Sequence, residues 1–252
     1  MARTPAARDL RRVIAARDES RGLLIAFEGP DGSGKTTQRK LLKTWLESRG
    51  DTVVSTRWAS SALVKPLLKV RKRIRTLSTE EYSLLHAVDF RHRVETSILP
   101  ALWEGKTVLA DRYLFTALAR DAARGLDLDW LLHAYSPLLW PDLVIYFSMT
   151  PEDSSRRVAS TRAPRFYEAG QDVTGLEDPL ASYGRFVDRV VTEYENLALV
   201  FKFVTVDSGD AVYRQHTQVR ELVESTQKRP WPAFSNEAVE EWLKKSSPAA
   251  TS

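Results

Sequence analysis

Short apolar runs separated by longer amphipathic stretches form the main hydrophobic pattern along this chain. The apolar runs have the length of strands and lie at Leu23–Phe27, Thr52–Ser55, Thr107–Ala110, Leu143–Phe147 and Phe201–Val206. Stretches with helical periodicity lie between them, most clearly at Thr37–Arg49, Thr79–Glu104, Trp130–Ser136, Pro151–Ser160 and Pro179–Leu197. Strands that alternate with helices predict a three-layer α/β fold, in which a parallel sheet of about five strands carries helices on both faces.

The two ends of the chain differ in composition from the region between them. Residues 1–21 carry six arginines among small residues. We interpret them as a basic, solvated N-terminal extension, with a short amphipathic helix over 9–16 as the alternative. Residues 228–252 begin with Pro and Trp and end rich in Ser, Pro and Ala, with a short helix predicted at Glu237–Lys245. We interpret this segment as a peripheral C-terminal tail, which leaves residues 22–227 as one domain.

Composition narrows the functional classes. The 252 residues include no cysteine, which excludes disulfides and thiolate metal sites. No apolar run approaches the length of a membrane span, and the N-terminus lacks the apolar core of a secretory signal, so we expect a cytoplasmic protein without a membrane partner. The formal net charge of +4 is weak support for a nucleic-acid partner, which we do not expect.

The strongest chemical signal is the pattern G-x-x-x-x-G-K-[ST], which reads GPDGSGKT directly after the first apolar run. Its glycines let the backbone curl so that N–H groups converge on a phosphate chain, Lys35 reaches the β- and γ-phosphates, and the Thr36 hydroxyl is placed to ligate Mg²⁺. The helix that follows directs the positive end of its dipole at the same point. We therefore expect a nucleoside-triphosphate site formed by Gly29, Pro30, Asp31, Gly32, Ser33, Gly34, Lys35, Thr36 and Thr37.

A second phosphate-site signal is the segment TVLADRY at 107–113. An apolar strand ends there in Asp111, and strand C-termini of an open parallel sheet face the ligand crevice. A carboxylate at this point can hold Mg²⁺ through water, and the adjacent Arg112 can bind phosphate oxygens with both guanidinium nitrogens. A structural Asp–Arg pair is the alternative.

Four motifs, taken together in their order and spacing, resemble the thymidylate kinases within the nucleoside monophosphate kinases. They are FEGPDGSGKTTQ at 27–38, ADRY at 110–113, WPDLVIYFSMTPE at 140–152 and FVDRVVTEYENLA at 186–198. The resemblance covers roughly residues 22–225. It implies a P-loop kinase fold over residues 22–227, a lid at about 150–178, ATP with Mg²⁺ as phosphoryl donor, and dTMP as the expected acceptor. It leaves the oligomeric state open, a homodimer included.

The resemblance also implies roles for individual residues. Asp31 occupies the loop position that contacts the acceptor sugar or organises the transfer site, and Arg57 resembles an arginine that binds the acceptor monophosphate. Some family members have an arginine in the phosphate loop where this chain has Gly32. The arginine that stabilises the transition state is therefore expected from the lid, with Arg165 the first candidate and Arg162 the second. The alternative is a basic, solvated stretch. The catalytic residues implied are Lys35, Asp31, Arg112, Arg165 and Arg162.

The segment expected to form the base pocket departs from the family pattern. Thymidylate kinases carry F-x-x-x-R on the long middle helix, where Phe stacks on thymine and Arg reads the edge of the base. The matching segment of this chain is LLHAVDFRHR at 84–93. His86 stands where the family has Phe, Phe90 stands where the family has Arg, and Arg91 follows one residue later. We expect weakened base discrimination, unless the helix is misaligned by one residue. The expected acceptor-binding residues are Arg57, His86, Phe90 and Arg112.

Two other functions stay open. One is a kinase for another acceptor, such as UMP, a deoxynucleoside or a non-nucleotide. The other is a regulatory module that binds a nucleotide without turnover. The intact Lys35, Thr36, Asp111 and Arg112 favour an enzyme, whereas the altered base pocket weighs the other way. Product formation with a panel of acceptors separates these cases.

Overall fold

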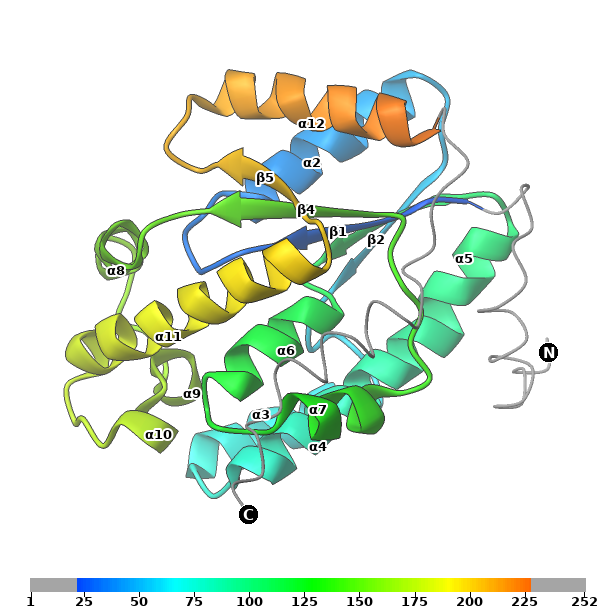
Figure 1. Cartoon of the computed structure of the whole chain (residues 1–252). Helices are drawn as coiled ribbons and strands as arrows, with labels where there is room; N and C mark the ends of the chain where they lie inside the picture. The colour runs from blue at the N-terminus through cyan, green and yellow to red at the C-terminus, as the bar shows by residue number, and fades with distance from the viewer. Residues whose placement is uncertain (1–21, 228–252) are drawn as a thin grey trace, which may run out of the picture.

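A computed structural model describes residues 22–227 of this protein. Its centre is one sheet in which all neighbouring strands are parallel, in the order β2-β3-β1-β4-β5 (Figure 1). The strands are β1 (Leu24–Glu28), β2 (Val53–Arg57), β3 (Thr107–Asp111), β4 (Leu143–Ser148) and β5 (Val204–Asp207). The predicted fold class is therefore confirmed. The interpretations of residues 1–21 and 228–252, including the helices considered at 9–16 and 237–245, lie outside the described residues.

Helices cover both faces of the sheet (Figure 1). One face carries α2 (Lys35–Ser48) and α12 (Val212–Gln227). The other face carries α4 (Thr79–Arg93), α5 (Leu99–Trp103), α6 (Leu114–Ala122), α7 (Leu128–Tyr135) and α11 (Pro179–Val200). The remaining helices follow strands β2 and β4 and are α3 (Lys65–Ile74), α8 (Pro151–Ala159), α9 (Phe166–Ala169) and α10 (Gln171–Thr174). No helix within residues 22–227 is both long and apolar enough to cross a membrane.

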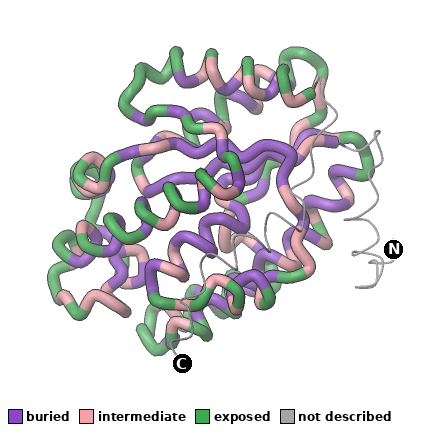
Figure 2. The backbone as a smooth tube through the Cα atoms, viewed as in Figure 1, coloured by how far each residue is buried: buried purple, intermediate pink, exposed green. Residues whose placement is uncertain are grey.

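The central strands are buried on both faces, as the purple tube at the middle of Figure 2 shows. One apolar cluster, which includes Phe90 and Phe115, fills the space under α4, α6 and α11. A second cluster, which includes Leu42 and Val219, packs α2 and α12 on the opposite face. Strands covered on both sides read as continuous apolar runs rather than alternating ones, which is why their positions were visible in the sequence.

The long middle helix predicted over Thr79–Glu104 is one continuous helical segment with an irregularity inside it. After α4 comes a single wide turn, η1 (Val94–Ile98), and then α5. Pro100 lies in the first turn of α5. Proline has no N–H to donate to the carbonyl four residues before it and its ring crowds that carbonyl, which accounts for the wider turn.

Three substantial helices were not named in the sequence analysis, namely α3, α6 and α12. Helix α6 is buried almost all round, its polar residues Thr116 and Asp121 included, so it does not have the exposed polar face of a surface helix. Helix α3 contains five cationic residues, and Leu68 is its one buried side chain. Its position therefore cannot be read from a pattern of core-facing residues.

The strand register brings three chain segments together at one edge of the sheet. Phe27 of β1 pairs with Asp111 of β3, and Asp111 pairs with Arg57 of β2. Because the strands are parallel, the loop after β1, the segment after β3 and the end of β2 all meet at this edge. The predicted phosphate-binding residues are thus neighbours in space although they lie far apart in the sequence.

Candidate active site

The loop after β1 has a backbone that only glycine fits at two positions. Gly29 has φ of +136°, and a Cβ there would lie 2.5 Å from the carbonyl oxygen of Phe147. Gly32 has φ of +80°, and a Cβ there would lie 3.0 Å from Cβ of Arg157. The loop can therefore pass close to β4 and α8 and curl at the start of α2 only with glycine at these points.

Lys35 is held inside this loop. Its ammonium donates hydrogen bonds to the carbonyl oxygen of Pro30 at 2.5 Å and to the Ser33 hydroxyl at 2.9 Å. Burial, followed by the nearby guanidinium of Arg112, lowers the pKa of Lys35 to about 7. A bound anion would reverse this effect, because negative charge within a few ångströms favours the charged ammonium. The side chain is therefore poised for a polyanionic ligand.

Thr36 and Asp111 form the part of the site that fits a divalent cation. The Thr36 hydroxyl donates to Oδ2 of Asp111 at 2.8 Å, and Arg39 Nε lies 3.5 Å from the same oxygen. Mg²⁺ prefers hard oxygen ligands and usually takes only one or two carboxylates, with water and substrate phosphates completing its shell. Within the described range, no group of three or more His, Cys, Asp or Glu could hold a metal alone. The pair fits a magnesium ion that is carried in with phosphates.

Asp31 joins the loop to two arginines. Its carboxylate lies 2.5 Å from Arg112 Nη2 and 3.1 Å from Arg120 Nη1. Burial alone would raise the pKa of Asp31, but the two guanidinium groups outweigh it and hold that pKa well below its usual value. Arg112 also donates to the carbonyl oxygen of Gly29 at 3.1 Å. The sequence analysis missed Arg120, because it lies on a helix outside every motif.

Glu28 is a second carboxyl group that the sequence analysis did not single out, although it stands inside the first motif. It is fully buried and accepts hydrogen bonds from Tyr113 N and Thr116 Oγ1, both at 2.7 Å, and from the Tyr194 hydroxyl at 2.9 Å. Burial raises its pKa, against the opposing effect of these hydrogen bonds and of Arg112. Glu28 thereby ties the end of β1 to the start of α6 and to α11.

The lid arginines take different positions. Arg157 donates to the carbonyl oxygen of Gly32 at 3.1 Å and to that of Ser208 at 2.9 Å, so it lies against the phosphate loop. Arg162 is exposed and pairs with Glu168 at 2.9 Å. Arg165 lines a separate cavity beside the loop. Arg157 falls within residues 150–178, predicted as a lid, but was not among the arginines expected to act there. It is the arginine of that segment that contacts the phosphate loop.

Two cavities meet at the strand ends. The first, of about 560 Å³, is lined by the phosphate loop together with Arg57 and Asp111. The second, of about 710 Å³, extends towards α3, α4 and α9. Asp31, Trp58 and Arg112 line both cavities. These three side chains therefore stand where a group could pass from one cavity to the other.

Aromatic side chains line the second cavity from Trp58 at the shared wall to Tyr82 and Tyr167 at its far end. Trp58 stacks on His86 with ring centroids 5.4 Å apart, and Tyr82 packs on both His86 (4.6 Å) and Tyr167 (5.2 Å). Phe90, by contrast, is fully buried in the apolar core, packs on rings beneath the helix, and does not line the cavity. Of the two α4 residues expected to bind the acceptor, His86 lines this cavity, whereas Phe90 has no exposed surface with which to contact a base.

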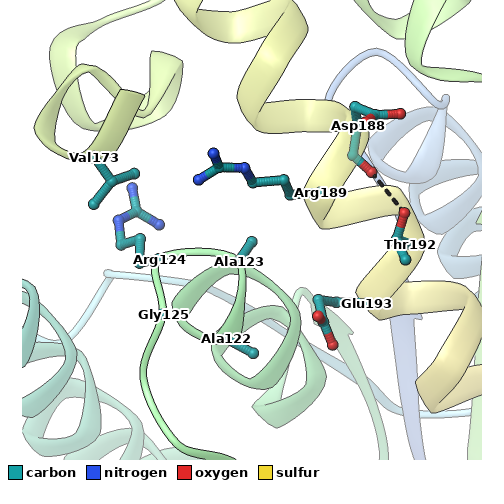
Figure 3. Close-up of a pocket in the computed structure, with 9 residues that line it drawn as sticks. All are labelled: Ala122, Ala123, Arg124, Gly125, Val173, Asp188, Arg189, Thr192 and Glu193. Atoms are coloured by element: carbon teal, nitrogen blue, oxygen red, sulfur yellow. Dashed lines mark hydrogen bonds between the residues drawn. The ribbon is translucent and has the colours of Figure 1, made fainter. Parts of the chain in front are cut away.

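A third hollow, of about 490 Å³, lies apart from these two (Figure 3). It is bounded by the end of α6 near Ala122 and by Arg189 and Glu193 on α11. Burial raises the pKa of Glu193. None of the predicted site residues lines it, so the expected chemistry belongs to the two cavities at the strand ends.

A phosphate loop at the edge of a parallel sheet, with a second cavity sharing one wall with it, defines a P-loop kinase. Comparison with known proteins narrows this class. The family model described as thymidylate kinase matches residues 27–175. A protein named probable thymidylate kinase 2 from Saccharolobus solfataricus is 39% identical over 206 residues, which cover 81% of this chain and 96% of that protein.

Two further relatives carry the same family name. A probable thymidylate kinase from Pyrococcus horikoshii is 42% identical over 144 residues, covering 55% of this chain and 70% of that protein. A thymidylate kinase from Bacillus velezensis is 34% identical over 146 residues, covering 55% of this chain and 69% of that protein. The chain belongs to the thymidylate kinase family. It is an ATP-dependent nucleoside monophosphate kinase.

Proposed function

We propose that this enzyme transfers the γ-phosphoryl group of Mg·ATP to dTMP and releases dTDP. The observation that carries the proposal is the wall shared by the two cavities, where Asp31 and Arg112 stand between the phosphate loop and the space for an acceptor. Phosphoryl transfer needs positioning and charge stabilisation rather than a covalent intermediate on the protein, and these residues supply both.

The donor side is assigned to the loop. Residues Gly29–Thr37 bind the phosphates of ATP, and Lys35 places its charge on the β- and γ-phosphates. Thr36 and Asp111 hold Mg²⁺, which when bound neutralises charge on the phosphates. Arg157, Arg162 and Arg165 are the lid candidates for the arginine that stabilises the transferring group. The contact of Arg157 with the loop favours it.

The acceptor side is assigned to the second cavity and the strand ends. Arg112 and Arg57 bind the acceptor monophosphate. Asp31, which its two arginine partners keep ionised, accepts a hydrogen bond from the acceptor sugar. The base enters the aromatic end, beside His86 and Trp58.

We further infer that residues 22–227 form the kinase domain, with a lid at about 150–178, and that the enzyme acts on free nucleotides in the cytoplasm. No nucleic-acid partner is proposed, since small anionic substrates account for the arginines that line the two cavities. A homodimer is compatible with every role given above.

A panel of acceptors tests the proposal. The purified protein is incubated with Mg·ATP and, separately, with dTMP, dUMP, UMP, dCMP and thymidine, and diphosphate formation is followed. We expect turnover of dTMP, strongly reduced turnover of thymidine, and dUMP closer to dTMP than is usual for the family. Phosphorylation of nucleosides in place of monophosphates would replace the proposal. Absence of any product with folded protein would favour a regulatory nucleotide-binding module.

A further inference from the structure

Four cationic residues of α3 line the acceptor cavity, but only one of them reaches its aromatic end. Lys65, Lys69 and Arg73 are exposed, whereas Lys72 is half-buried. The Lys72 ammonium lies 3.0 Å from His86 Nε2 and 4.6 Å from the centroid of the Tyr82 ring. Lys72 is therefore built into the far end of the cavity rather than left on its rim.

The contact with His86 fixes how both side chains present their hydrogens. A lysine ammonium has three donors and no acceptor, so His86 Nε2 must accept and the ring hydrogen must be on Nδ1. His86 is 1% exposed. Its burial and the charge of Lys72 lower its pKa well below the usual value, which keeps the ring neutral. Lys72 also donates to the Tyr82 hydroxyl at 3.5 Å. Two of its three hydrogens are thus used by His86 and Tyr82, and one remains for a ligand in the cavity that Lys72 lines.

The surroundings of Lys72 match a nucleobase better than a second phosphate. A planar ring can stack against the aromatic side chains of Trp58, Tyr82 and Tyr167 at this end of the cavity. The phosphate groups have their own cations at the other end, in Arg57 and Arg112. A single donor-only group among aromatic rings discriminates between the edges of bases, because it can pair with a carbonyl oxygen but not with an amino group.

We propose that Lys72 is a specificity-determining residue that donates a hydrogen bond to the exocyclic carbonyl oxygen of the acceptor base. It selects bases with a carbonyl at that edge, thymine and uracil, against cytosine and adenine, which carry an amino group there. This inference rests on the proposed function and names how the same site chooses its acceptor. It also explains why Phe90 can stand on α4 where the family pattern has an arginine, and be buried in the core. The cation that contacts the base is supplied by α3 instead.

The test uses dUMP and dCMP, which share sugar and phosphate and differ at the edge that Lys72 meets. The kcat/KM ratio of dUMP to dCMP is measured for the natural protein, for Lys72→Met and for Lys69→Met. Lys69 is the matched control, since it lies on the same helix and lines the same cavity but makes no contact with His86. We expect the ratio to fall about 10- to 100-fold in Lys72→Met, the value of a charge-assisted hydrogen bond. The ratio should be unchanged in Lys69→Met.

The ratio separates recognition from structural damage, because a distorted cavity would lower kcat/KM for both acceptors together. Dissociation constants for the two nucleotides, measured by calorimetry, provide a second readout that does not depend on turnover. An unchanged ratio in an active Lys72→Met enzyme overturns the inference and leaves the proposed function standing. An equal fall in Lys69→Met, or a natural protein that treats dUMP and dCMP alike, overturns it as well. If the proposed function is wrong, the natural protein turns over no nucleoside monophosphate, and this result is distinct from a change in the ratio.

Discussion

The two ends of the active-site crevice handle buried charge in opposite ways. At the phosphate end, Asp31 has two arginine partners within 3.1 Å, and its pKa is held well below the usual value. At the base end, burial raises the pKa of Asp121 to about 6, and His86 is kept neutral. The carboxylate at the phosphate end is held in its charged form, whereas the carboxyl group of Asp121 and the imidazole of His86 are shifted towards their neutral forms.

The difference follows from how each carboxylate is paired. Arg112 and Arg120 converge on Asp31, so the attraction of two guanidinium groups exceeds the cost of burial. Arg124, the arginine nearest to Asp121, lies 3.8 Å away and makes its shorter contact, 2.8 Å, with Asp172. Asp121 is therefore buried without full compensation. Charge stabilises a transferring phosphoryl group, whereas a base is distinguished by hydrogen bonds to particular atoms on its edge.

The largest expected effect on activity comes from substitution of Lys35 at the phosphate end, the part of the crevice formed by the phosphate loop. Lys35→Ala removes the ammonium that is held inside the loop, and we expect kcat to fall by about a thousandfold. Thermal stability should stay close to that of the natural protein, because a loop lysine contributes little packing. Lys40→Ala, on the exposed side of the following helix, is the control. Near-normal turnover by a folded Lys35→Ala protein would contradict the assignment of this loop as the donor site.

The phosphate end could be predicted from the sequence because its chemistry is local. The loop, its lysine and its threonine are contiguous, and their spacing is dictated by the shape of a phosphate chain. Asp111 and Arg112 follow a strand whose apolar run is unmistakable, and parallel strands must end at the same edge. Arg120 could not be singled out because it reaches Asp31 from the second turn of α6, a helix that lies outside every motif.

The base end could be predicted only in part, because it is assembled from separate elements. His86 on α4 lines the second cavity, whereas Phe90, one turn further on, is buried in the core. Lys72 comes from α3, a helix rich in cations whose one buried side chain is Leu68, so no run of core-facing residues marks its position. Tyr167 comes from α9. No spacing rule links these segments, so their meeting depends on the tertiary fold.

A buried glutamate links the two ends and gives the next largest expected effect. Glu28 accepts every hydrogen bond it makes, from Tyr113 N, the Thr116 side chain and the Tyr194 hydroxyl. Glu28→Gln replaces one acceptor oxygen by an NH₂ group that faces these donors. We expect a loss of about 2–4 kcal/mol in the free energy of unfolding. Urea unfolding measures it, with Glu47→Gln on the exposed face of α2 as control.

Since Glu28 sets the start of α6, which carries Arg120, the variant should also weaken the pairing at Asp31. A Glu28→Gln protein as stable as the natural one would mean that the network around Glu28 tolerates a donor. In that case Glu28 does not hold the two ends of the crevice together.

The smallest expected effect tests the suppressed charge at the base end. The folded pKa of Asp121, about 6, lies above the ordinary value of 3.8, so between about pH 4 and pH 6 the folded state binds more protons than the unfolded chain. The contribution of Asp121 to stability is therefore fully present below pH 4 and is lost as the pH rises through 6. Asp121→Asn removes this dependence.

We compare the free energy of unfolding of Asp121→Asn with that of the natural protein at pH 4.5 and at pH 7.5. The difference, variant minus natural, should be about 1–2 kcal/mol larger at pH 7.5 than at pH 4.5. Urea unfolding at both pH values measures the change, and Asp188→Asn, an exposed carboxylate on α11, should show no such gain. Asp31 has a lowered pKa, so its contribution to stability is present above the ordinary value of 3.8 and is lost as the pH falls below it. Urea unfolding of Asp31→Asn between about pH 2.5 and pH 4.5 should therefore show a change of the opposite sign. If both carboxylates shifted stability in the same direction, burial rather than pairing would govern both ends, and the contrast between them would disappear.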